Sequence, residues 1–211
     1  MVTAPTADDT LLWVADTAAL DEAGLGFYAG WLGASERRRC ARFLRPQRRR
    51  QFIAGRALLR LMLARLLKCA PAAIALDERP GNAPRLAGAG LPAVGFSIAH
   101  SGHWVACAAS LQGPVGLDIE CIDAGRDVVA LAEQAFDAAT AAQVRACTGA
   151  ARLHAFYRHW CLYEAGIKLG AASAADHVYT HAGLALALRC ARPLAAPRLD
   201  IVDLGAGMPG A

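Results

Sequence analysis

Apolar and polar residues alternate along several short stretches of the chain, and this pattern predicts β-strands. Apolar and β-branched runs bounded by turn-forming residues predict strands at about 11–14, 94–98, 104–110, 115–121, 183–189 and 199–202. The second and third of these should form a hairpin with the polar stretch 99–103 at its tip. Residues 71–92 are rich in proline, glycine and alanine, which indicates loops around short strands.

Apolar residues at intervals of three and four predict helices in the other segments. We expect helices at about 21–32, 47–67 and 128–170, the last interrupted near residues 148–149. A further, basic helix should begin with Ser35 as its N-cap and be interrupted by Pro46. The chain therefore runs strand, helices and hairpin, and then strand, helices and strands.

This order of elements predicts an α+β fold of two similar lobes. We expect one lobe of residues 1–113 and a second of residues 114–211, joined near Gly113 and Pro114. A seam between two such lobes is a natural place for a cleft, and therefore for a binding site.

The composition is that of a folded globular chain. Apolar residues make up 55% of the 211 residues and charged residues 19%, which excludes a disordered chain. No apolar run reaches the roughly 18 to 20 residues that cross a bilayer, and residues 1–9 lack a basic start followed by an apolar stretch. The seven cysteines include no C-x-x-C pair, so neither a disulfide framework nor a zinc site is predicted. We expect a cytoplasmic protein with reduced cysteines and no membrane partner.

Positive charge is concentrated in one segment. Residues 36–68 hold twelve of the 22 basic residues and one acid, a net charge of +11, so the rest of the chain carries −7 of the overall +4. Such a density of arginine attracts anions, and a nucleotide phosphate, an acidic protein and a nucleic acid are all possible targets. Nucleic acid is the least favoured, because residues 37–50 contain one aromatic residue, Phe43, and no recognisable nucleic-acid-binding module.

The segment 115–120 predicts a strand with two carboxylates on one face. Side chains alternate along a strand, so Val115, Leu117 and Ile119 can enter a core while Asp118 and Glu120 point to the opposite side. Two neighbouring carboxylates can hold Mg²⁺, which is usually bound by one or two carboxylates together with substrate phosphates. The alternative interpretation is a solvated strand edge without a ligand.

Two other segments carry polar groups of interest. In the hairpin, His100 beside Ser101 and Ser97 could donate hydrogen bonds to a phosphate, and a structural turn histidine is an equally good explanation. On the last predicted helix, Glu164 and Lys168 are four residues apart, which by itself favours an exposed ion pair.

Taken together and in this order, these segments resemble the 4'-phosphopantetheinyl transferases, specifically the longer surfactin-synthetase-activating (Sfp-type) class. The resemblance covers about residues 31–170 and rests on the segments 35–43, 55–60, 96–104, 115–120 and 156–168. It implies a pseudo-dimer of two α/β lobes with the active site in the cleft between them.

The resemblance also implies roles for the candidate residues. Asp118, Glu120 and Glu164 would hold Mg²⁺, or alternatively Mn²⁺, against the diphosphate of coenzyme A. Lys168 would contact the phosphates, and it would form the catalytic group with Asp118 and Glu164. The 3'-phosphoadenosine end of coenzyme A would face Arg39, Ser97, His100 and Ser101, with Arg79 or Arg85 supplying a further cation.

The reaction implied by the resemblance is transfer of the 4'-phosphopantetheine arm of coenzyme A to a serine of an apo acyl or peptidyl carrier protein. Adenosine 3',5'-bisphosphate would be released, and Glu164 would take the serine proton directly or through a metal-bound water. The partner would be an acidic carrier protein, for which the basic face is complementary, and the enzyme would be a monomer.

The sequence departs from the family pattern at several positions. Tyr163 stands in place of a lysine, Ala99 in place of a serine, Ser97 in place of an asparagine, and residues 82–84 in place of a loop that supplies a cation. The chain also ends soon after residue 202, so the C-terminal sheet is expected to be shortened. These departures favour, as an alternative, a catalytically weakened relative that binds coenzyme A or a carrier protein without turnover. A basic nucleic-acid-binding module is the third interpretation.

Overall fold

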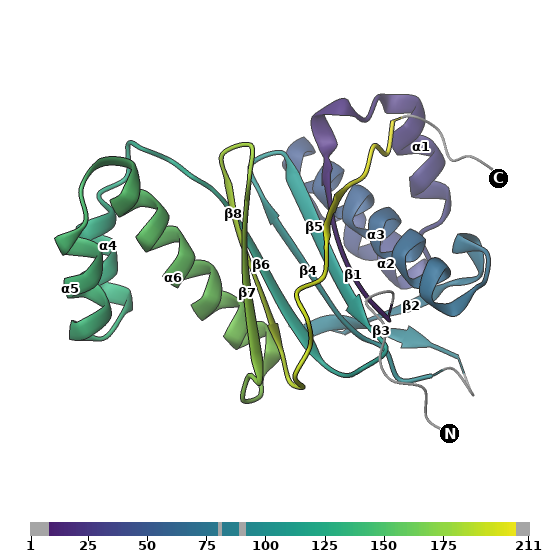
Figure 1. The fold of residues 1–211 in the computed structure, drawn as a ribbon. Coiled ribbons are helices and arrows are strands. Elements are labelled where there is room, and N and C mark those ends of the chain that lie inside the picture. The colour runs from purple at the N-terminus through teal and green to yellow at the C-terminus, as the bar shows by residue number, and fades with distance from the viewer. Residues whose placement is uncertain (1–8, 80–81, 89–91, 206–211) are drawn as a thin grey trace, which may run out of the picture.

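The computed structural model describes residues 9–79, 82–88 and 92–205 (Figure 1). Residues 1–8, where a secretion signal was sought, and residues 80–81, part of the loop expected in the segment 71–92, lie outside the described residues. The described residues contain both helices and strands, so the predicted mixed α/β class is confirmed.

The first sheet has four strands in the order β4-β5-β1-β9. Strands β1 (Thr10–Asp16), β4 (Gly95–Ser101) and β5 (Trp104–Ser110) are antiparallel neighbours, with β5 in the middle. The fourth strand, β9 (Leu199–Ile201), pairs in parallel with β1. The strand predicted near the C-terminus therefore exists, and it lies in the sheet built mainly from N-terminal residues.

The hairpin between β4 and β5 is present, but its turn is shorter than predicted. His100 and Ser101 belong to β4, and only Gly102 and His103 separate the two strands. Gly102 has φ +57°, a left-handed conformation that glycine adopts without the steric cost of a Cβ atom. The polar residues expected at the tip therefore lie along an edge strand, where they can face a neighbouring element.

The second sheet has three antiparallel strands in the order β6-β8-β7. Strands β6 (Val115–Cys121) and β8 (Leu184–Cys190) lie near their predicted positions. Strand β7 (Ala175–His181) was not predicted, because it is the outer strand and its residues are mostly polar and partly exposed. Strands β2 (Ala75–Arg79) and β3 (Asn82–Ala87) form a separate antiparallel hairpin, which precedes β4 in the sequence.

Helices lie on both sides of the pair of sheets (Figure 1). The N-terminal group is α1 (Glu22–Gly30), α2 (Ala34–Cys40) and α3 (Pro46–Leu67), and α3 packs on β5 and β1. The C-terminal group is α4 (Val128–Ala135), α5 (Ala138–Ala146) and α6 (Gly149–Leu169), and α6 packs on β6 and β8. Short 3-10 helices occupy Thr17–Ala19 and Pro71–Ala73.

Helices α2 and α3 each begin at a different residue from the one predicted. The N-cap of α2 is Gly33 and not Ser35, because the Glu36 carboxylate accepts a hydrogen bond from the Gly33 N–H at 2.8 Å and closes the first turn two residues earlier than expected. Pro46 is the first residue of α3, a position where a missing N–H costs nothing.

The core has three clusters that define four layers. One cluster lies between α1–α3 and the first sheet, the second lies between the two sheets, and the third lies between the second sheet and α4–α6. Alternation on β1 shows the arrangement, because Leu11 and Trp13 face the N-terminal helices while Leu12 and Val14 face the second sheet. In the described part of the chain, no helix combines the length and the apolar character needed to cross a membrane.

Candidate active site

Strand β6 carries its carboxylates on the face that points to α6. Leu117 and Ile119 are buried in the cluster between the sheets, as predicted, so Asp118 and Glu120 point to the opposite side. Asp118 is only 6% exposed, while Glu120 is partly exposed. The interpretation of this strand as a solvated edge is therefore wrong for Asp118.

The two oxygens of Asp118 have different surroundings. Oδ1 accepts a hydrogen bond from Lys168 Nζ at 2.7 Å, while Oδ2 is buried and has no hydrogen-bond partner among the residues that the structure describes. Burial is the strongest influence on this carboxyl and raises the pKa of Asp118 above its ordinary value. The positive charge of Lys168 opposes this effect, and the nearby charge of Glu120 adds to it. A buried anionic oxygen without a partner is a site that a cation would stabilise.

Gly116 explains why α6 can lie so close to the carboxylates. A Cβ atom at this position would be 2.0 Å from the Ala165 carbonyl oxygen and 2.6 Å from the Leu169 backbone nitrogen. Only glycine lets the backbone of the helix approach the strand at this point. Glu164 and Lys168 immediately precede these two helix residues, so the same contact brings both side chains to the neighbourhood of β6.

Lys168 forms its ion pair with a residue of a neighbouring strand and not, as expected, with Glu164 of its own helix. The lysine bonds to Asp118 of β6, and Glu164 is partly buried on the helix. Among the described residues, no three histidine, cysteine, aspartate or glutamate side chains are grouped as a metal site. Asp118 and Glu120 share a face, then, and the structure does not group Glu164 with them.

Two serines join the edges of the two sheets. Ser97 Oγ accepts a hydrogen bond from the Leu117 N–H, and Ser101 Oγ accepts one from the Cys121 N–H, both at 3.0 Å. Ser101 also donates to Glu120 Oε2 at 2.7 Å. These serines of β4 therefore fix the position of β6 and orient one of its carboxylates, a role that the sequence analysis did not anticipate.

A basic cavity of about 440 Å³ lies beside these strands, between α3 and the C-terminal end of α6. Strand β4 and the β2–β3 hairpin complete its wall. Its cationic or ionisable lining residues are Arg39, Arg48, Arg56, His100 and Lys168, and its polar and apolar lining includes Gln51, Phe52, Pro84, Phe96, Ser97 and Ile167.

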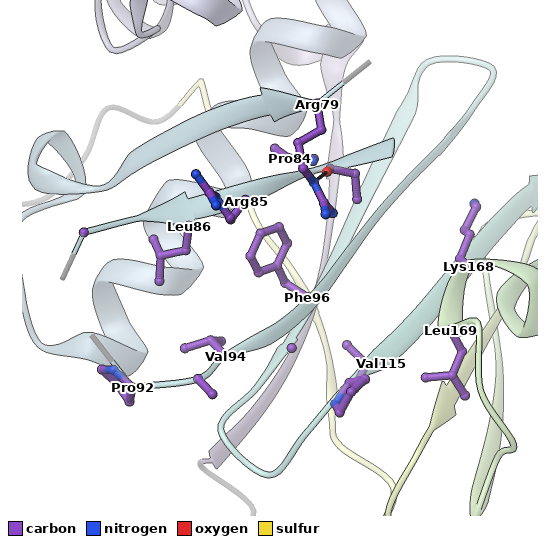
Figure 2. A pocket seen from close by; sticks show the side chains of 15 residues that line it. Arg79, Pro84, Arg85, Leu86, Pro92, Val94, Phe96, Val115, Lys168 and Leu169 are labelled. Atoms are coloured by element: carbon purple, nitrogen blue, oxygen red, sulfur yellow. Dashed lines mark hydrogen bonds between the residues drawn. The ribbon is translucent and has the colours of Figure 1, made fainter. Parts of the chain in front are cut away.

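A second cavity of about 470 Å³ adjoins the first. The two share Ala83, Pro84, Phe96 and Lys168. In Figure 2, Phe96 lies between Arg85 of the hairpin and Lys168 of α6. Arg79 and Arg85 line only this second cavity, and Ser101 lines neither of the two. Of the predicted contacts to coenzyme A, Arg39, Ser97, His100 and Lys168 line the basic cavity.

His100 and Arg48 form one contact on the wall of the basic cavity. The Arg48 Nη1 atom lies 2.9 Å from Nε2 and 3.0 Å from Nδ1 of the histidine ring. The ring keeps contact with solvent, but the surrounding protein removes part of its hydration, which is the main reason that the pKa of His100 lies below its ordinary value. The charges of Arg48 and Lys168 lower the pKa further.

Arg39 of α2 lines the cavity, with 46% of its side chain exposed. Arg56 of α3, which the sequence analysis did not assign to the site, lies beneath it. The guanidinium groups of both arginines lie near the Phe52 ring, at 5.6 Å and 4.7 Å from its centroid, and both bond to Glu78. The segment 55–60 supplied a signal for Arg56, but nothing in the sequence indicated Glu78.

Comparison with known proteins gives consistent matches along the chain. Residues 22–112 match a family model described as 4'-phosphopantetheinyl transferase, N-terminal, and residues 114–181 match one described as the 4'-phosphopantetheinyl transferase superfamily. The two matches meet at the position where the two lobes were expected to join.

Similar proteins include three with related names. The chain is 30% identical over 141 residues to a putative 4'-phosphopantetheinyl transferase of Synechocystis sp., a match that covers 67% of the chain and 57% of the relative. It is 30% identical over 151 residues to the 4'-phosphopantetheinyl transferase HetI of Nostoc sp., covering 70% and 62%, respectively. A 4'-phosphopantetheinyl transferase of Bacillus subtilis is 28% identical over 137 residues, covering 65% and 59%. The chain thus spans about three fifths of the length of these relatives.

Proposed function

The chain belongs to the 4'-phosphopantetheinyl transferase superfamily, and from this premise we propose that it transfers the 4'-phosphopantetheine arm of coenzyme A to a serine of an apo acyl or peptidyl carrier protein. The observation that carries the proposal is the buried carboxylate of Asp118, bonded to Lys168, which lines a basic cavity. We also assign the chain to the Sfp-type class, with a pseudo-dimer of lobes 1–113 and 114–211 and the active site at their seam.

The basic cavity supports coenzyme A as the substrate. Coenzyme A carries a diphosphate and a 3'-phosphate, and three guanidinium groups, one lysine and one histidine line the cavity. We place the 3'-phosphate near Arg39, His100 and Arg48, and the diphosphate near Lys168, all of which line the cavity. In this arrangement the reacting phosphorus lies toward Asp118.

The donor set of β6 fits a divalent cation. Oδ2 of Asp118 is a carboxylate oxygen without a hydrogen-bond partner in the described parts of the chain, and the Glu120 carboxylate lies on the same face and is oriented by Ser101. We propose that Asp118, Glu120 and Glu164 hold Mg²⁺, or alternatively Mn²⁺, of which oxygen donors are the preferred ligands. When bound, the ion neutralises charge on the diphosphate and strengthens the electrophilic character of its phosphorus.

The remaining chemistry needs alignment and one proton acceptor. The carrier serine oxygen forms a bond to the β-phosphorus, and the bond from that phosphorus to the bridging oxygen breaks, so that adenosine 3',5'-bisphosphate leaves. Glu164, partly buried on α6 one turn before Lys168, accepts the serine proton directly or through water. Lys168 stabilises negative charge on the phosphates as the leaving group departs.

The basic surface supports an acidic protein partner. Arg42, Arg45 and Arg49 are exposed around the start of α3. Such a surface would speed the encounter with an acidic carrier protein in a salt-sensitive manner.

One observation favours a second candidate function. The structure does not group Glu164 with Asp118 and Glu120, and Ala83 lines the cavity where the family pattern has a cation. A protein that binds coenzyme A or a carrier protein without turnover would show the same features.

Mass spectrometry of a panel of apo carrier proteins, incubated with this protein, coenzyme A and Mg²⁺, tests the proposal. A mass gain of one phosphopantetheine arm on the carrier serine is the expected result, and a reaction without the protein is the control. Calorimetric binding of coenzyme A without any mass gain would support the second candidate. Absence of mass gain together with absence of binding to both coenzyme A and the carrier proteins would refute the two functions together.

A further inference from the structure

Glu78 of β2 bridges two arginines from different helices. Its Oε1 accepts hydrogen bonds from Arg56 Nη2 at 2.5 Å and from Arg56 Nε at 3.0 Å, while its Oε2 pairs with Arg39 Nη1. The glutamate is largely buried, with 10% of its side chain exposed. A single carboxylate therefore holds two of the three guanidinium groups that line the basic cavity.

The bridge is the outer part of a longer series of alternating charges. Arg56 Nε also lies 3.2 Å from Glu36 Oε1, and Arg60 bonds to both oxygens of Glu36. Arg60, Glu36 and Arg56 are almost fully buried, so each depends on its partners for compensation of its charge. Arg39 is the member with substantial exposure, and it is exposed in the cavity.

The series is anchored in rigid elements. Arg56 and Arg60 lie on the long helix α3, Glu36 and Arg39 lie on α2, and Glu78 ties both helices to the β2–β3 hairpin. The Phe52 ring packs against both guanidinium groups. The hydrogen bonds to Glu78 outweigh the effect of burial and keep the pKa of this carboxyl below its ordinary value, so the bridge is charged at neutral pH.

We propose that Glu78 is a positioning residue that holds the Arg39 guanidinium at the cavity wall for a phosphate group of the nucleotide substrate. The contact with Glu78 uses Nη1 of Arg39, and a guanidinium has five N–H donors, so other donors of Arg39 are open to a ligand. A fixed guanidinium loses less conformational entropy on binding than a free one. The inference rests on the proposed function, because it takes the nucleotide part of coenzyme A as the ligand.

The alternative is that Glu78 only reduces the positive charge of the cavity. The two roles predict opposite signs for the same substitution. If Glu78 merely offsets charge, Glu78→Gln makes the cavity more positive and tightens the binding of a polyanion. If Glu78 positions Arg39, the same substitution weakens binding although the attraction at long range increases.

Calorimetric titration with coenzyme A and with adenosine 3',5'-bisphosphate tests the inference. We expect Glu78→Gln to weaken both by about tenfold or more, since hydrogen bonds to charged groups typically contribute this much. In the transfer reaction the KM for coenzyme A should rise while kcat at saturation stays close to that of the wild type. Glu133→Gln is the matched control, because Glu133 pairs with Arg145 on the exposed surface of α4 and α5, away from the cavity lining.

A double-substitution cycle separates positioning from a general loss of structure. If Glu78 acts through Arg39, the pair Glu78→Gln and Arg39→Ala should bind no more weakly than Arg39→Ala alone. Additive losses, unchanged or tighter binding by Glu78→Gln, or an equal loss in Glu133→Gln would overturn the inference. Thermal unfolding of each variant shows whether the fold is retained, and Glu78→Asp serves as a second, shorter acid if Glu78→Gln does not fold.

The outcomes distinguish this inference from the proposed function. A wild-type protein that binds both nucleotides but transfers nothing refutes the transferase activity and leaves the binding comparison decisive for Glu78. Active wild-type protein with an unaffected Glu78→Gln variant overturns only the positioning role. A wild-type protein that binds neither nucleotide overturns both.

Discussion

Lys168 Nζ lies 2.7 Å from Asp118 Oδ1 and connects the C-terminal end of α6 to the middle of β6. The two residues are fifty positions apart in the chain. Their contact brings a buried carboxylate together with a cation that lines the basic cavity.

Replacement of Asp118 tests the proposed metal site. Asp118→Asn keeps the volume of the side chain but removes its negative charge, so we expect Mg²⁺-dependent transfer to fall by about 100-fold or more. The measurement is turnover of coenzyme A with an apo carrier protein over a range of Mg²⁺ concentrations. Circular dichroism should show an intact fold, and undiminished turnover would refute the role of Asp118.

Gly116 is expected to tolerate no side chain. In Gly116→Ala the new Cβ would lie 2.0 Å from the Ala165 carbonyl oxygen, so α6 must move away from β6. We predict a loss of about 1–3 kcal/mol in the free energy of unfolding, together with a loss of transfer activity as Glu164 and Lys168 are displaced.

Gly26→Ala is the matched control for this substitution. Gly26 lies within α1, and a Cβ atom there would meet nothing within 4 Å. Because alanine favours a helix over glycine, this variant should be more stable by roughly 0.5–1 kcal/mol. Chemical denaturation measures both variants, and equal effects of the two substitutions would contradict the close contact of α6 and β6.

Arg39→Ala tests where the 3'-phosphate binds. Since we place this phosphate at Arg39, the variant should lose affinity for coenzyme A by roughly 10-fold to 100-fold and lose much less for dephospho-coenzyme A. Competition binding with the two compounds is the measurement. Equal losses for both would remove the assignment.

The lowered pKa of His100 predicts a dependence of stability on pH. The unfolded chain takes up a proton near the ordinary value of 6.5, while the folded chain takes it up only at lower pH. The unfolded state therefore binds more protons in this window, so stability is lost as the pH falls below about 6.5. His100→Gln should reduce this loss.

Thermal unfolding of wild-type protein and His100→Gln between about pH 8 and about pH 5 checks the prediction. Arg48 on α3 and Lys168 on α6 are the charged groups that act on the ring. A wild-type profile that is flat, or one that the substitution leaves unchanged, would show that His100 does not cause the dependence.

The local structure of the chain followed from its sequence where the pattern was strong. The alternation along 115–121 indicated which residues of β6 are buried and which carry the carboxylates, and the structure confirms this. The apolar spacing likewise indicated α3 to within a residue of its ends. Weak patterns failed, because the polar outer strand β7 and the two-residue shift of the α2 N-cap depend on neighbours that spacing does not reveal.

The sequence determined the candidate groups, namely the two carboxylates of β6, Glu164 and Lys168 on one helix, and a dense set of arginines. Tertiary structure decided which of them meet. Lys168 pairs with Asp118 and not with the nearby Glu164, because burial makes an unpaired carboxylate costly and an exposed helical pair contributes little. For the same reason Glu78, which has no motif, pairs with the buried Arg56 and also holds Arg39: a buried guanidinium requires counter-charges, and the packing of β2 against the helices supplies one of them.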